Sequence, residues 1–124
     1  MDTHHAIEDL ARNLAARQAI AEASKPPMIL KFYSVVVGQV LKLLHRHGLG
    51  QTLAYIQLRA AGKPGSPYSL LGRQIDRWLV TNLGISAAST LAALTSRDSR
   101  FYLEATEQTW LFVRAVRREL EKSS

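Results

Sequence analysis

The sequence predicts an all-α fold, a single-domain bundle of about six helices around a central hydrophobic helix. Apolar residues recur at helical spacing, no segment alternates apolar and polar residues as a half-buried strand does, and Gly and Pro cluster at few places. The apolar share of 47 % and the charged share of 21 % are those of a folded globular chain. A chain of 124 residues is expected to form one domain, residues 1–124, with one core.

The first helix is expected over residues 3–23, with Asp2 or Thr3 as its N-cap. Its apolar stripe, expected to face the core, consists of Ile7, Leu10, Leu14 and Ile20. Pro26 and Pro27 end this helix and can begin the next one. Proline is tolerated in a first helical turn because the N–H groups there have no helical partner.

The second helix, expected over residues 27–46, is the predicted centre of the bundle. Apolar side chains cover nearly all of its circumference, which is typical of a helix that is buried on several sides. At about 100° per residue, Lys31 and Lys42 lie only about 20° apart around the axis, and Arg46 lies about 40° further on. These three cations form a narrow polar strip along the helix, and Ser34 and Gly38 lie on the same strip. The cations can bind a ligand, or they can simply extend from a semi-buried edge to water.

Four more helices are expected after the second, over about residues 50–61, 68–82, 86–94 and 95–121. Residues 62–67 contain two prolines and two glycines and are predicted to form an exposed loop with Lys63 at its tip. Arg59 lies near the end of the third helix, and Arg73 and Arg77 face outward from the fourth. The outer face of the last helix mixes Arg and Glu residues, which is typical of a solvated surface.

The stretch HRHGLGQTLAY, residues 45–55, combines two histidines and two glycines. Histidines two residues apart point about 200° apart on a helix, whereas helical pairs of metal ligands need a spacing of three or four residues. The glycines lack the spacing of a dinucleotide-binding motif and the Gly-Lys-Ser/Thr of a P-loop. We therefore expect a corner between two helices, at which Gly48 adopts a positive φ. The N–H groups that open the next helix can still bind one phosphate.

The net charge of +6 is unevenly distributed along the chain. No Asp or Glu occurs between Glu22 and Asp76, and that span holds seven Lys and Arg residues. Carboxylates of the C-terminal helices can neutralise these cations in space, or the region can bind a polyanion. A basic surface without a special role is a third interpretation of the same pattern.

Several kinds of site are not expected. The chain has no cysteine, which excludes disulfides, zinc-thiolate sites and thiol nucleophiles. Its N-terminus is polar and no apolar run approaches the ~18–20 residues that span a bilayer, so the expected location is the cytoplasm, with no membrane contact. No segment shows a nucleophile and base pair, paired carboxylates or a metal cluster. We expect no enzymatic activity, no cofactor and no small-molecule substrate.

Two segments resemble a known family. Residues 40–56, VLKLLHRHGLGQTLAYI, are similar to the corner after a hydrophobic helix in the small helical subunit of type III-B CRISPR (Cmr) effector complexes. Residues 98–106, DSRFYLEAT, are similar to the segment that opens the final helix of that family, and the similarity covers most of residues 1–120. The resemblance implies a non-enzymatic subunit in antiviral defence that stacks with copies of itself and other Cmr subunits along paired guide RNA and target RNA.

The charge pattern selects the residues that are expected to contact RNA, since the resemblance assigns none. They are Lys31, Lys42, Arg46, Arg59, Lys63, Arg73 and Arg77. Lysine and arginine bind phosphate without reading bases, as a subunit that serves many guide sequences requires. The same basic face also fits an acidic protein partner. Helix-turn-helix binding of DNA through residues 44–55 is disfavoured because the helix after Gly50 is mostly apolar.

Overall fold

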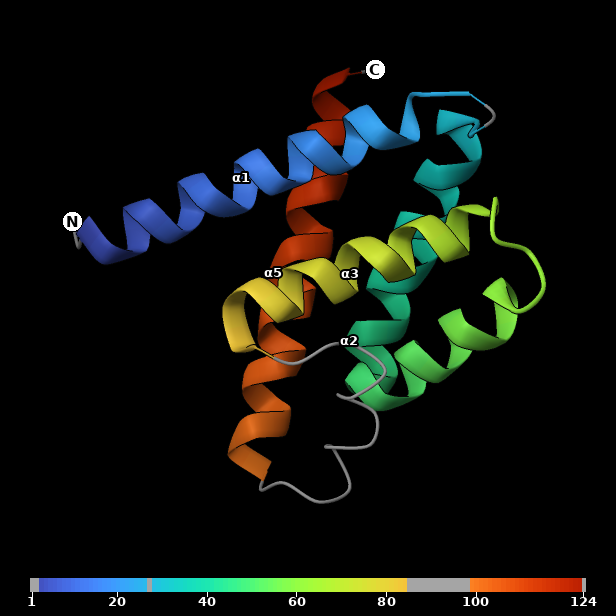
Figure 1. Cartoon of the computed structure of the whole chain (residues 1–124). Coiled ribbons are helices and arrows are strands. Elements are labelled where there is room, and N and C mark those ends of the chain that lie inside the picture. Colours follow the sequence, from blue (N-terminus) through green and yellow to red (C-terminus); the bar gives the residue numbers. More distant parts are fainter. Residues whose placement is uncertain (1–2, 27, 85–98, 124) are drawn as a thin grey trace.

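Figure 1 shows the computed structural model, which describes residues 3–26, 28–84 and 99–123. Within these residues the chain forms four helices and no strand, namely α1 (Thr3–Ala23), α2 (Leu30–Ala60), α3 (Pro67–Leu83) and α5 (Ser99–Ser123). The predicted all-α class is confirmed. The predicted count of about six helices is not matched within the described residues, in which α2 spans the expected second and third helices across a bend at Gly48. The helix predicted at residues 86–94 lies outside the described residues.

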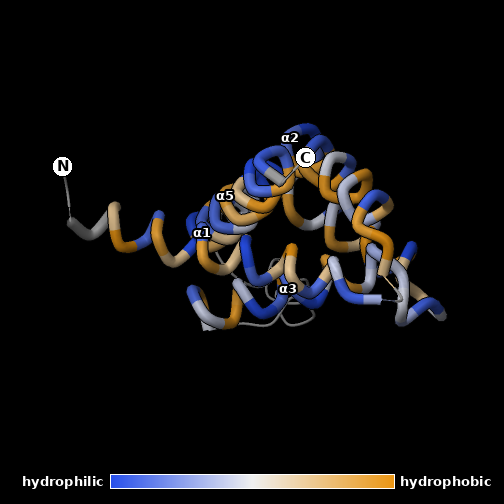
Figure 2. The backbone as a smooth tube through the Cα atoms, turned by 90° about the horizontal axis from the view of Figure 1, so that it is seen from above, coloured by the Kyte–Doolittle hydropathy of each residue, from blue (hydrophilic) through white to orange (hydrophobic). Residues whose placement is uncertain are grey.

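The helices cross rather than run in parallel. In Figure 1, α5 and the first half of α2 run beside each other, α3 crosses both, and α1 crosses α5. The helix α5 contacts the other three, and the longest shared boundaries of α2 are with α3 and α5. The N-terminal turns of α1 reach beyond α5, away from the other helices (Figures 1 and 2).

The bend in α2 is made by Gly48, whose φ of 77° and ψ of −177° are the non-helical values inside this helix. The Thr52 hydroxyl donates to the carbonyl oxygen of Gly48 at 2.7 Å, and Leu49 is fully buried at the corner. The Tyr102 hydroxyl of α5 accepts a long hydrogen bond of 3.5 Å from the Gly50 N–H. The predicted corner and its positive φ are confirmed, and the two segments that carry the family resemblance meet there.

The apolar core lies where α2, α3 and α5 face one another. Its largest members include Tyr33, Val40, Leu44, Leu71, Ile75, Leu79, Val113 and Val116. Trp78 of α3 stacks on Phe112 of α5 with ring centroids 5.4 Å apart. One side of α2 is open, since Phe32 and Val35 are each more than half exposed. The predicted burial of this helix on several sides is confirmed, since α3 and α5 both pack on it, but the side with Phe32 and Val35 is not covered by the described residues.

The prediction that the apolar stripe of α1 faces the core is wrong for most of its residues. Ile7, Leu10 and Leu14 are 61 %, 59 % and 53 % exposed, whereas the buried positions of this helix are Ala16, Ala19 and Ala23. Alanine lets two helix backbones approach closely, and α1 packs mainly on α5. The large side chains of α1 consequently point outward.

A buried hydrogen-bond network joins α1, α2 and α3. The Tyr33 hydroxyl donates to Gln74 Oε1 at 2.6 Å, and Gln74 Nε2 donates to the Ala19 carbonyl and to Glu22 Oε1, each at 3.0 Å. The Arg77 guanidinium binds both oxygens of Glu22, at 2.6 and 3.0 Å. The hydrogen bond from Arg77 lowers the pKa of Glu22, and burial raises the pKa of the Tyr33 phenol. The network fixes how the three helices pack.

Tyr33→Phe should lower the free energy of unfolding by about 1–3 kcal/mol, because Gln74 Oε1 then has no donor in a buried site. Tyr68→Phe is a matched control, since the Tyr68 hydroxyl also donates to a glutamine oxygen, Gln39 Oε1, at 2.6 Å but at the surface. We expect it to cost less than about 0.5 kcal/mol. Urea unfolding followed by circular dichroism measures both variants, and equal costs would contradict the role of the buried network.

Candidate nucleic-acid interface

The cations predicted on one line of the second helix are all exposed on the first part of α2. Lys31, Lys42 and Arg46 lie before the bend at Gly48. Within the residues that the structure describes, Arg77 is the one member of the predicted RNA-binding set that forms an ion pair with a carboxylate. The positive charge of the α2 line is therefore not neutralised by direct ion pairs with the described carboxylates.

An open groove of about 520 Å³ lies between α2 and α5, and of the three cations Lys42 lines it. Its walls are Ser34, Val35, Gly38, Gln39 and Lys42 of α2 and Arg117, Leu120 and Glu121 of α5. Arg117 thus lies at the same groove as Lys42, although the sequence only placed it on a solvated face. Glu121 binds Arg117 at 3.4 Å, so α5 supplies one carboxylate to the groove as well as one guanidinium.

Gly38 forms part of the groove wall without filling it, because a Cβ at this position would meet nothing within 4 Å. Gly38→Ala should therefore raise the free energy of unfolding by about 0.5–1 kcal/mol, since alanine restricts the unfolded chain and favours the helix. Thermal and urea unfolding measure the change. A loss of stability would show that a neighbour occupies the space beside Gly38.

Arg59 is connected to the groove through two aromatic rings. Its guanidinium carbon lies 5.3 Å from the centre of the Tyr55 ring, and Tyr55 meets the Tyr68 ring edge-on at 5.9 Å. The Tyr68 hydroxyl donates to Gln39, which lines the groove beside Lys42. Cations alternating with aromatic rings are typical of surfaces that bind nucleic acid, because rings stack on bases and cations bind phosphates.

Comparison with known families identifies the chain. The family model described as CRISPR-associated protein (Cas_Cmr5) matches residues 9–121, which include both the Gly48 corner and Tyr102. The chain belongs to the Cas_Cmr5 family. It is therefore a small subunit of the type III-B CRISPR (Cmr) complex, and the resemblance found in the sequence is confirmed. No curated protein and no solved structure gave a significant match to the chain.

The remaining predicted cations of this Cas_Cmr5 protein lie apart from the α2 line. Arg73 donates to the Pro64 carbonyl at 3.3 Å and to the Ser69 hydroxyl at 2.8 Å, which fixes the loop between α2 and α3. Lys63 is exposed in the same loop. Arg77 is held by Glu22 at the contact of α1 with α3, and it would have to leave this carboxylate to bind a phosphate.

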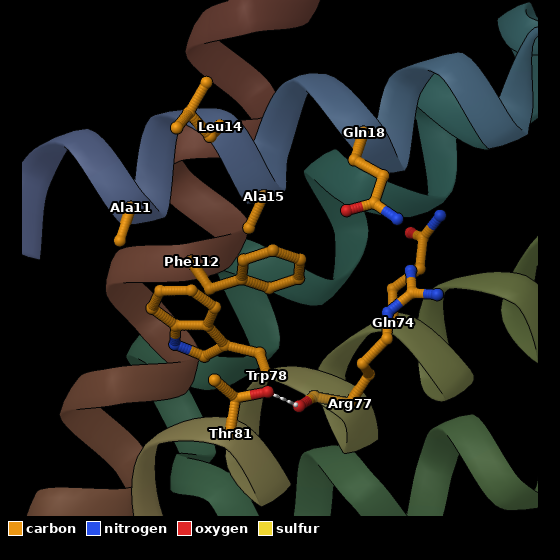
Figure 3. A pocket seen from close by; sticks show the side chains of 9 residues that line it. All are labelled: Ala11, Leu14, Ala15, Gln18, Gln74, Arg77, Trp78, Thr81 and Phe112. Atoms are coloured by element: carbon orange, nitrogen blue, oxygen red, sulfur yellow. Dashed lines mark hydrogen bonds between the residues drawn. The ribbon is translucent and has the colours of Figure 1, made fainter.

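Arg77 also lines a separate cavity of about 320 Å³, shown in Figure 3. The stacked pair of Trp78 and Phe112 lines it, together with Gln74, Arg77 and Thr81 of α3. Gln74 and Arg77 belong to the network around Glu22, and the Thr81 hydroxyl donates to the Arg77 carbonyl at 2.9 Å. Such a cavity offers apolar contact and no paired acid and base.

The residues that the structure describes contain no group of three or more Asp, Glu, His or Cys side chains able to hold a metal ion, and both corner histidines, His45 and His47, are exposed. None of the described helices has an apolar stretch long enough to cross a membrane.

Proposed function

We propose that this Cas_Cmr5 protein is a non-catalytic subunit that binds the backbone of paired guide RNA and target RNA in the RNA-silencing Cmr complex. Its basic face consists of Lys31, Lys42, Arg46, Arg59 and Arg117. The observation that carries the proposal is the line of exposed cations Lys31, Lys42 and Arg46, of which Lys42 lines an open groove, with no described carboxylate in an ion pair with any of the three. Lys63 and Arg73 are further proposed contacts with RNA phosphates. Arg77 is the weakest proposed contact because its guanidinium is already paired with Glu22.

The shape of the basic face fits an extended polyanion. From Lys31 to Arg46 the line runs about 22 Å along the helix axis, at about 1.5 Å per residue. A single small anion would occupy only one part of it. Contacts from Lys and Arg to phosphates are independent of base sequence, and they suit a subunit that must accept any guide.

The partners in this proposal are the other Cmr subunits, guide and target RNA, and further copies of the same chain that stack along the RNA. Individually weak phosphate contacts add up when several linked copies bind one RNA, because each later contact is intramolecular. The proposed setting is the cytoplasm, where the complex would act in antiviral defence.

Co-purification tests the proposal. A tagged chain expressed together with the other Cmr subunits and a guide array should isolate with guide RNA, and the isolated complex should bind target RNA more weakly as the salt concentration rises. If the chain isolates with an acidic protein and the complex binds RNA equally well without it, the basic face serves a protein partner instead.

A further inference from the structure

The outward face of α1 carries large apolar side chains. Ile7, Leu10 and Leu14 are spaced three and four residues apart, so they form one stripe along the helix. Figure 3 shows Leu14 directed away from Trp78 and Phe112, whereas Ala15 on the same helix points toward them. Clustered exposed apolar side chains mark surfaces that bind other proteins.

An arginine pocket of about 150 Å³ lies beside this stripe, between α1 and α5. It is lined by Asp9, Arg12, Asn13, Leu111, Arg114, Ala115 and Arg118. Asp9 binds Arg12 at 2.8 Å, and Arg114 lies over the Trp110 ring at 4.9 Å. Three arginines thus line the pocket together with one carboxylate, which is already bound to Arg12. The pocket carries excess positive charge in a space that fits one anionic group.

Arg12 has a hydrogen-bond donor left over. Its side chain is only 13 % exposed, and its Nε is buried without a partner although one terminal nitrogen binds Asp9. A buried donor without an acceptor is unfavourable, so a small turn of Arg12 that lets Nε meet an incoming oxygen would stabilise this site. The orphaned Nε is a second observation, independent of net charge, that points to a ligand with an acceptor oxygen.

The stripe and the pocket are parts of one surface. Asn13 lines the pocket, and Leu10, three residues earlier, is its neighbour on the surface of α1. A ligand that covers both parts needs apolar side chains beside a carboxylate. An RNA backbone would leave the leucines in water. A second copy of the same face would place its arginines against the arginines of the first copy, and the like charges would repel each other.

We propose that this α1 docking face, formed by Ile7, Leu10, Leu14 and the arginine pocket, binds an acidic amphipathic helix of another protein subunit. Apolar side chains of the partner helix cover the stripe, as in other complexes in which a helix docks through one face. A partner Asp or Glu accepts hydrogen bonds from the guanidinium groups of the pocket, a pairing that is strong when two N–H groups bind one carboxylate. Docking at this face does not require RNA contact at the basic face.

The test places a photo-crosslinking residue, p-benzoylphenylalanine, at Leu10 of the full chain in the assembled complex. Mass spectrometry should identify a crosslink to a Glu- or Asp-containing helix of another subunit. Leu58, which is 76 % exposed on the second half of α2, is the control position and should give no such crosslink.

The arginines are tested in the same chain. Arg114→Gln with Arg118→Gln should reduce the Leu10 crosslink at least fivefold, whereas the matched pair Lys25→Gln with Arg100→Gln should leave it unchanged. Circular dichroism verifies that each variant folds, and RNA binding is measured separately. A crosslink to RNA, a crosslink to a second copy, no crosslink, or one that does not depend on the arginines would each overturn the docking proposal without bearing on the basic face.

Discussion

Gly48→Ala should destabilise the folded chain by roughly 3 kcal/mol or more, the largest single-residue effect that we expect. Two causes act together. The φ of 77° with ψ of −177° belongs to a region that is essentially restricted to glycine. A Cβ at Gly48 would also lie 2.6 Å from the Tyr102 hydroxyl, well inside van der Waals contact.

Matched variants separate these causes. Gly38→Ala is the same change in the same helix, without a positive φ and without a close neighbour, and should stabilise the protein. Tyr102→Phe removes the oxygen that a Cβ at Gly48 would meet, so Gly48→Ala should cost less in that background. Urea unfolding of the four combinations at Gly48 and Tyr102 forms a double-mutant cycle. If Gly48→Ala were no more costly than Gly38→Ala, the α2 corner would not depend on glycine.

Reversal of three charges should have the largest effect on binding. The variant with Lys31→Glu, Lys42→Glu and Arg46→Glu should reduce the affinity of the assembled complex for target RNA roughly 10- to 100-fold at 0.15 M salt. The loss should be equal for RNAs of unrelated sequence, because phosphate contacts do not read bases. Filter binding or fluorescence anisotropy measures both quantities.

A charge-matched pair controls for the overall change in charge. Lys25→Glu with Arg100→Glu lowers the net charge as much as Lys31→Glu with Lys42→Glu does, but it changes exposed residues that do not belong to the α2 line. Only Lys31→Glu with Lys42→Glu should weaken RNA binding strongly. Equal effects of the two pairs would mean that long-range attraction, rather than contact at the basic face, draws RNA to this subunit.

Much of the fold follows from local sequence signals, and the failures have a physical cause. Gly48 was predictable because a Gly-Leu-Gly step after an apolar helix favours a positive φ at the first glycine. The orientation of α1 was not predictable, because periodicity shows which residues share a face of a helix. It does not show whether the alanine face or the leucine face meets the neighbouring helix. Here α1 packs mainly on α5, and its buried positions are Ala16, Ala19 and Ala23.

Some residues of the candidate site were predictable from the sequence, and others were not. Lys31, Lys42 and Arg46 were grouped correctly by helical geometry within one segment. Arg117 could not be added from the sequence, because only the packing of α5 against α2 brings it to the groove beside Lys42. The ion pair of Arg77 with Glu22 also joins distant segments, and it separates Arg77 from the cations of the α2 line.

The most direct test of the basic face is the salt dependence of RNA binding by the assembled complex. Each phosphate contact contributes about 0.7–0.9 to the slope of log affinity against log salt concentration. Replacing Lys31, Lys42 and Arg46 by Gln should therefore make the slope shallower by roughly 2–3 for one bound copy of the subunit, whatever the RNA sequence. An unchanged slope, with the complex intact, would contradict RNA backbone contact at this face.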